Sequence, residues 1–257
     1  MKTLILFTIM TIISNSQAQL IAYDGFDYSL DDSLTGLDGG SGWATAWTSN
    51  SGSGKIVSGL NYSDANGNQL VREGNAYEVN PSIFFYQTLR DTTTTFGTGG
   101  TTVWLSFIIQ QANVSTGTNY ATVTLGTGFT FDSNAMIGGI GGNPSHSFIG
   151  NFYGSSGGVS DLSNTLGLSE STFLVLRFDF SESGNDSLSL WFNPILDNTI
   201  GDPLLTYSGK NYAEMISGIT IAHGDFRNFV YDEIRIGIDY ASVSPIRANL
   251  MFKDGFE

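Results

Sequence analysis

The sequence predicts an all-β protein, folded as a two-sheet antiparallel jelly-roll sandwich. Short stretches that alternate apolar and polar residues recur along the chain, separated by the Asn-Gly, Gly-Gly and Ser-Gly pairs that are typical of turns. Long stretches with the 3.6-residue period of a helix are missing. About ten such strands without an internal repeat are typical of a jelly roll.

Three strands show by their alternation which face of a sheet each side chain occupies. They span Thr101–Gln110, Phe173–Phe180 and Ser187–Asn193. In the first of them one face holds Val103, Leu105, Phe107 and Ile109, and the other holds Trp104, Ser106, Ile108 and Gln110. We expect further strands at Lys55–Leu60, Gln69–Glu73, Ser82–Leu89, Ala121–Leu125, Phe148–Tyr153, Gly218–Ala222 and Phe229–Gly237.

The remaining segments are expected to be loops, with one short helix at Asn211–Ser217. The glycine-rich segment Gly138–Gly158 is expected to be a loop, a strand around Phe148 and a second loop. The two ends of the chain carry the stretches YDGFDY (Tyr23–Tyr28) and FVYDEIRIG (Phe229–Gly237), which are both apolar and acidic. We expect these first and last strands to meet in one sheet.

The first 18 residues have the features of a signal peptide. Lys2 precedes the apolar run Leu4–Ile13, which is shorter than the roughly 20 residues that span a bilayer, and small residues end the segment at Ala18. The expected organisation is a signal peptide at 1–18, a single jelly-roll domain at 19–245 and a C-terminal tail at 246–257. We expect a soluble protein with no membrane span that is secreted or held in the cell envelope.

Composition narrows the classes of partner and site. The formal net charge of −14 is spread thinly along the chain, so nucleic acid and anionic membranes are poor partners. Cysteine is absent, which excludes disulfides and thiolate metal sites. An exported chain without cysteine indicates a bacterial envelope or extracellular medium.

Six stretches in this order resemble exported bacterial proteins of the concanavalin A-like lectin/glucanase superfamily, near its laminin G-like and pentraxin-like modules. They are YDGFDY, GGSGWATAW, TTVWLSFIIQ, FLVLRFDF, DSLSLWFNP and FVYDEIRIGIDYASVSP, and they cover nearly the whole chain after residue 18. The resemblance implies a curved two-sheet jelly roll, in which the concave face commonly holds glycans and the convex side can hold a structural calcium. The terminal DGFE is similar to the ends of many exported proteobacterial proteins.

Calcium is the first candidate ligand. It requires about six to eight oxygen ligands, and Asp24, Asp27 and Asp232 would supply several if the first and last strands pair. The alternative is that an Asp beside a Gly forms a turn and that Asp232 forms a surface ion pair with Arg235.

A carbohydrate platform is the second candidate. Sugars stack their C–H faces on aromatic rings and pair their hydroxyls with amides, which suits Trp104 with Gln110 and Trp191 with Asn193. Each of these tryptophans lies on the polar face of its strand. The alternative is that a residue this large packs at a sheet edge or under a loop.

Glycosidase chemistry has less support. It usually needs two carboxyl groups about 5 to 10 Å apart, and the ExDxE pattern of the related glucanases is absent. The adjacent pair Asp232 and Glu233 is expected to point to opposite faces of its strand. The sequence therefore favours a lectin-like domain that binds carbohydrate non-covalently. The alternatives are a glycoside hydrolase or polysaccharide lyase with another catalytic set, and a structural envelope protein without a small ligand.

Overall fold

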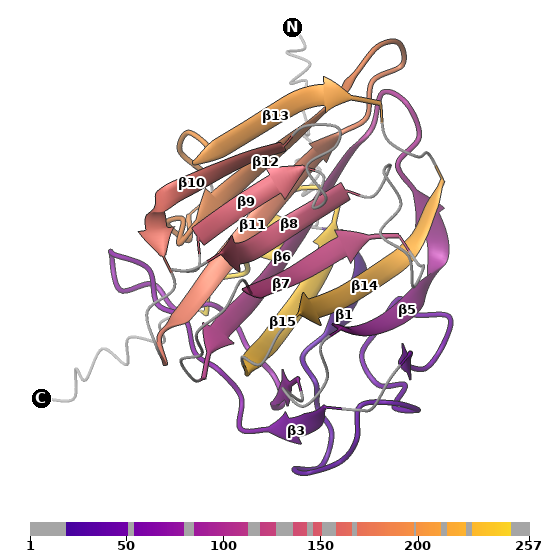
Figure 1. Cartoon of the computed structure of the whole chain (residues 1–257), viewed down its shortest axis with the longest axis vertical. Coiled ribbons are helices and arrows are strands. Elements are labelled where there is room, and N and C mark those ends of the chain that lie inside the picture. The colour runs from indigo at the N-terminus through magenta and orange to yellow at the C-terminus, as the bar shows by residue number, and fades with distance from the viewer. Residues whose placement is uncertain are drawn as a thin grey trace, which may run out of the picture.

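The computed structural model describes residues 19–50, 54–79, 85–112, 119–126, 136–142, 146–150, 158–165, 169–197, 199–211, 215–224 and 228–247. Two antiparallel β-sheets lie face to face, and in Figure 1 the seven-stranded sheet lies in front of the eight-stranded one. Over these residues the structure has one short helix, α1 (Tyr240–Val243), and no helix with the length and apolar character needed to cross a membrane. The predicted signal peptide lies outside the described residues.

The eight-stranded sheet has the order β13-β12-β11-β6-β15-β4-β3, with β1 added beside β15. Its strands are β1 (Leu20–Asp24), β3 (Lys55–Val57), β4 (Ala76–Glu78), β6 (Thr102–Gln111), β11 (Ser171–Asp179), β12 (Asp186–Phe192), β13 (Leu205–Lys210) and β15 (Phe229–Gly237). The antiparallel pairing of β1 with β15 places Asp24 opposite Ile234. This pairing confirms that the first and last strands of the domain meet.

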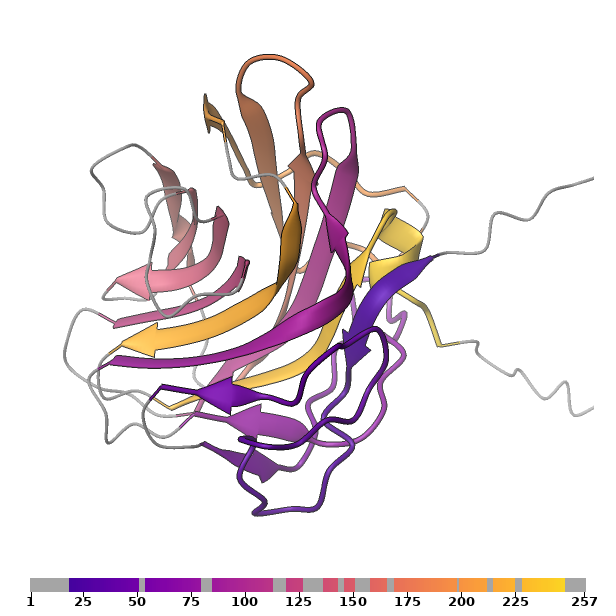
Figure 2. The same cartoon turned by 90° about the vertical axis from the view of Figure 1, so that its right-hand side faces the viewer.

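The seven-stranded sheet has the order β10-β9-β8-β7-β14-β5-β2. Its strands are β2 (Thr48–Ser49), β5 (Phe85–Phe96), β7 (Asn119–Leu125), β8 (Met136–Gly142), β9 (His146–Gly150), β10 (Gly158–Thr165) and β14 (Ile216–Gly224). Figure 2 shows that β5 and β14 are strongly bent, with their concave side turned away from the eight-stranded sheet.

The main hydrophobic core lies between the two sheets. It contains the four residues of β6 that alternation assigned to one face, namely Val103, Leu105, Phe107 and Ile109. The facing sheet contributes inward residues such as Val123 and Ile221. The two-sheet sandwich and the facing of β6 are therefore confirmed.

A second apolar cluster covers the outer face of the eight-stranded sheet. Residues 58–75, here called the covering segment, contribute Leu60, Tyr62 and Leu70 to this cluster, and α1 contributes Tyr240 and Val243. These side chains pack on the outward residues of β6, β11, β12 and β15. The eight-stranded sheet is consequently buried on both faces.

Several local predictions are wrong, for identifiable reasons. Gly138–Gly142 belongs to strand β8 and not to a loop, because its glycines pair along both β7 and β9. Ile216 and Ser217 begin strand β14, where a helix was expected. The strand expected at Gln69–Glu73 does not form, and in this segment Leu70 makes an isolated antiparallel bridge with Ile246. The tail from residue 248 onward lies outside the described residues.

Candidate functional site

Trp104 and Trp191 lie side by side on the outer face of the eight-stranded sheet. Their ring centroids are 5.4 Å apart with an interplanar angle of 28°, and the Tyr240 ring lies 5.7 Å from that of Trp104. The covering segment and α1 leave each tryptophan only 7% exposed. The two rings pack in the second apolar cluster, so neither offers an open face to a sugar.

The two amide side chains of the predicted platform are also used internally. Gln110 donates its side-chain N–H to the carbonyl of Ser169 at 2.9 Å. Asn193 accepts a hydrogen bond from the backbone N–H of Phe173 at 2.8 Å, and its own φ of 50° places it in a tight turn after β12. These groups hold the ends of strands together, and their role as sugar ligands stays a prediction.

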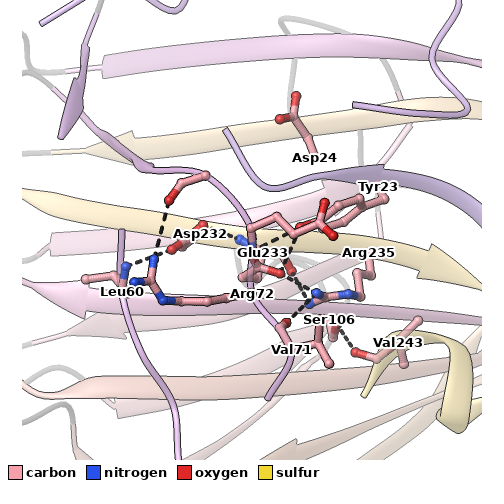
Figure 3. A network of polar contacts seen from close by, with 12 residues as sticks. Tyr23, Asp24, Leu60, Val71, Arg72, Ser106, Asp232, Glu233, Arg235 and Val243 are labelled. Carbon is pink, nitrogen blue, oxygen red and sulfur yellow. Dashed lines mark hydrogen bonds and ion pairs between the residues drawn. The ribbon is translucent and has the colours of Figure 1, made fainter. Parts of the chain in front are cut away.

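The three carboxylates predicted to bind calcium do not converge. Figure 3 shows the Asp24 carboxyl group turned away from Asp232. Asp27 is exposed, whereas Asp24 and Asp232 are fully buried. Within the described part of the chain, no group of three or more His, Cys, Asp or Glu residues could hold a metal ion. These residues therefore do not fit a calcium site.

Asp24 instead joins the two sheets through a buried ion pair with Arg90 of β5, at 2.6 Å. The Asp24 carboxylate also accepts hydrogen bonds from the Trp47 indole at 2.8 Å, the Tyr28 hydroxyl at 2.9 Å and the Phe26 backbone at 2.8 Å. Burial raises the pKa of Asp24, against the opposing effect of these donors and of the Arg90 charge. Both oxygens of the Asp24 carboxylate therefore accept hydrogen bonds from the protein itself.

The loop that contains GGSGW (residues 39–43) places Trp43 and Trp47 next to the Arg90 side of this ion pair. Gly42 has a φ of +80°, and a Cβ there would lie 2.0 Å from the Ile21 carbonyl oxygen, so the loop can lie this close to β1 only with glycine. The Arg90 guanidinium then lies 5.1 Å from the ring centroid of Trp43 and 5.6 Å from that of Trp47. Trp43 and Trp47 therefore hold a buried cation by cation–π contacts.

Asp232 and Glu233 point to the same side of β15, contrary to the alternation expected for adjacent residues. Glu233 has a φ of 55°, and the register with β6 shifts between Asp232 and Arg235, which is a β-bulge. The flanking residues Tyr231 and Ile234 both face the main core. Two consecutive carboxylates are thus presented to the covering segment (Figure 3).

The two carboxylates anchor the covering segment to the sheet. Asp232 accepts the backbone N–H of Leu60 at 2.7 Å, and Glu233 accepts that of Glu73 at 2.7 Å. Glu233 also contacts Arg235, and the hydroxyl of Tyr23 donates to it at 3.2 Å. Burial raises the pKa of both Asp232 and Glu233. This network fixes the covering segment, and both carboxylates are buried beneath it.

Calcium is expected to leave the melting temperature of the protein unchanged, because Asp24 and Asp232 are occupied by protein donors. A site filled at 100 times its dissociation constant would instead add about 2.7 kcal/mol to the free energy of unfolding. Melting curves with calcium and with excess chelator distinguish the two results. A clear rise in the melting temperature with calcium would show that the protein has a calcium site.

The outer face of the seven-stranded sheet offers a different arrangement at its centre. Gln87 of β5 lies in register with Ala222 of β14, which pairs with Thr122 of β7. The next outward row is Leu89, Thr220 and Thr124. The intervening residues Val123 and Ile221 face the core, so these six side chains share the bent outer face seen in Figure 2.

Two polar atoms on this face have no hydrogen-bond partner among the described residues. They are Oε1 of Gln87, a residue only 1% exposed, and Oγ1 of Thr124, which is 6% exposed. By contrast, the hydroxyl of Thr220 donates to the carbonyl of Gly126 at 2.9 Å. Buried polar atoms are nearly always paired, so an unpaired acceptor and an unpaired hydroxyl on one face indicate a position for a polar ligand or water.

Sequence reasoning did not single out Gln87 or Thr124. Threonines alternate with apolar residues in NYATVTL and in GITIAHG, which predicts strands with one polar face. That signal was present, but it does not distinguish a solvated face from a ligand face. The distinction depends on burial of the polar atoms, which only the folded structure shows.

The comparisons with known proteins show the fold. No protein-family model matches the chain, and no curated protein matches it. The globular domain of T. cruzi calreticulin is similar to it with a TM-score of 0.51 and 14% identity, over 77% of this chain and 85% of that one. An endo-β-1,4-glucuronan lyase from the fungus Trichoderma reesei has a TM-score of 0.49 and 16% identity, over 90% and 100%. Lectin II from Ulex europaeus has a TM-score of 0.42 and 10% identity, over 66% and 89%.

Proposed function

We propose that this chain, which has the two-sheet jelly-roll fold of the concanavalin A-like superfamily, binds carbohydrate non-covalently on the outer face of its seven-stranded sheet. The observation that carries the proposal is the pair of unpartnered polar atoms, Gln87 Oε1 and Thr124 Oγ1, on that concave face. The resemblance found in the sequence implies glycan binding on the same kind of face. The predicted platform around Trp104 gives less support because its rings pack in the second apolar cluster and its amides Gln110 and Asn193 are hydrogen-bonded within the protein.

The chemistry of this face suits sugar hydroxyls. The Gln87 carbonyl oxygen accepts a hydrogen bond, and the Thr124 hydroxyl both donates and accepts one. Their neighbours Thr122, Thr220 and Ala222 have small side chains and are themselves buried. A sugar hydroxyl that pairs with Gln87 would satisfy an acceptor that otherwise carries a desolvation cost.

Binding without bond cleavage agrees with the carboxylates of this face. On the described residues of β5, β7 and β14, Asp91 is the one acidic side chain in outward register. Glycoside hydrolysis generally uses two carboxyl groups that flank the scissile bond. The described residues of these three strands do not supply that pair, which favours a lectin-like function over glycoside hydrolysis.

Gln87→Met is expected to weaken glycan binding by at least about tenfold, or about 1.4 kcal/mol, because it removes the acceptor while keeping the shape of the side chain. Thr124→Val is expected to act in the same direction. The measurement is a glycan-array screen of residues 19–257 followed by titration of the best ligand against each variant.

Gln110→Met is the matched control, since it makes the same change on the eight-stranded sheet, where Gln110 bonds to Ser169. It is expected to leave binding unchanged. The melting temperature of Gln87→Met is expected to equal or slightly exceed that of the parent, because an unpaired acceptor is removed. An array with no binding, or binding lost in Gln110→Met and kept in Gln87→Met, would refute the proposed face.

A further inference from the structure

Of the five Lys and Arg residues that lie in strands, four belong to the eight-stranded sheet. The chain has ten Lys and Arg residues in all. Four of them lie in strands of the eight-stranded sheet, namely Lys55, Arg177, Lys210 and Arg235. The seven strands of the other sheet together contain one, Arg90.

That single cation does not reach the outer face. Arg90 lies in register with Ile219 and faces the core, where its ion pair with Asp24 leaves its side chain 1% exposed. His223 of β14 lies in register with Ala121 on the same inward side and is buried. Burial lowers the pKa of His223 to about 4, so its ring is uncharged at neutral pH.

The outward side chains at the centre of the seven-stranded sheet are uncharged, and the nearest charge along β5 is negative. The outward rows contain Gln87, Leu89, Thr122, Thr124 and Thr220, followed by Asp91 opposite Gly218. A carboxylate or sulfate placed on such a surface would lose its hydration without gaining a cation, which is costly. The net charge of −14 also repels a polyanion at long range.

We infer that the proposed binding face takes uncharged glycans and excludes polyuronates and sulfated glycans. This inference rests on the proposed function and specifies the ligand class of the same site. The hydroxyl and amide groups of the face match the hydroxyls of a neutral sugar, and the absence of an outward cation among its described strand residues selects against acidic sugars. Discrimination thus comes from an uncompensated charge on the rejected ligand.

The test compares neutral polysaccharides with polyuronates and sulfated polysaccharides of similar length, at low and physiological salt. Neutral ligands are expected to bind with an affinity that changes less than about twofold with salt, because no ion pair is screened. Polyuronates and sulfated chains are expected to bind at least about tenfold more weakly, as charge mismatch predicts. Equal or tighter binding of the anionic polymers would overturn the inference.

Leu89→Lys places a cation on the half-buried outward position between Gln87 and Asp91. It is expected to raise polyuronate affinity by about tenfold, as one new charge contact permits. Ser208→Lys on β13 adds the same charge to an exposed position of the other sheet and is expected to have no effect. A gain in both variants would show general attraction to the added charge and would contradict the inference.

Failure of this inference is distinguishable from failure of the proposed function. Polyuronate binding that Gln87→Met abolishes would keep the binding face and refute the ligand class. Polyuronate binding that Arg227→Gln abolishes, at a position outside the described residues, would refute the ligand class and point to a different cation. Absence of binding to every glycan would refute both.

Discussion

Asp24→Asn is expected to lower the free energy of unfolding by about 3–5 kcal/mol, because it leaves the Arg90 guanidinium buried without a counter-charge. Asp24 and Arg90 are 0% and 1% exposed in their side chains and lie 2.6 Å apart. The same carboxylate receives the Trp47 indole and the Phe26 backbone N–H, so an amide there also places a donor against donors. Chemical denaturation of parent and variant measures the loss.

The double variant Asp24→Asn/Arg90→Met separates charge from packing. Removing both partners of a buried pair is far less costly than removing one, so the double variant is expected to be more stable than Asp24→Asn alone. Asp31→Asn provides the surface control, since Asp31 pairs with Lys55 at 3.2 Å and both side chains are more than half exposed. Its expected loss is below about 1 kcal/mol. Equal losses of unfolding free energy for Asp24→Asn and Asp31→Asn would contradict a stabilising role for the buried Asp24–Arg90 ion pair between the sheets.

Trp104→Ala is expected to cost about 3–5 kcal/mol of stability, as is usual when a large buried aromatic residue is truncated. The ring stacks on Trp191, contacts Tyr240 and lies 5.7 Å from the Arg177 guanidinium. Removing it opens a cavity beneath the covering segment and α1. Thermal and denaturant unfolding of this variant, and of Trp104→Phe as the conservative control with a smaller loss, give the measurement.

Glycan binding distinguishes the packing role of Trp104 from a ligand role. Under conditions where Trp104→Ala is folded, its affinity for glycan is expected to match that of the parent. A variant that melts like the parent but no longer binds would show that the Trp104 ring touches sugar, and would return the site to the eight-stranded sheet.

The sequence predicts the sandwich well because successive side chains along an antiparallel strand point to opposite faces of the sheet, so alternation assigns each residue to a face. β6 follows this rule through its whole length, and β15 has the bounds expected for it, Phe229–Gly237. The meeting of β1 with β15 was predictable because both stretches are apolar and acidic in the same way. Patterns of this kind can be read from the sequence because the position of a residue within its own strand decides which face of the sheet it occupies.

The candidate site was harder to predict because its chemistry depends on what covers each face. Alternation correctly places Trp104 outward, but nothing in its strand indicates that Tyr62 and Tyr240 cover that face. The bulge at Glu233 also breaks alternation at the position where Asp232 was expected to bind metal. Gln87 is 1% exposed in the fold, and nothing in the sequence of its strand indicates that burial.

A crystal structure with the neutral oligosaccharide that binds best would locate the binding face. We expect sugar hydroxyls within hydrogen-bonding distance of Gln87 Oε1 and Thr124 Oγ1, on the concave side of the seven-stranded sheet. Sugar bound over Trp104 and Trp191, or a sugar-free face in which water alone pairs with Gln87 and Thr124, would contradict this expectation.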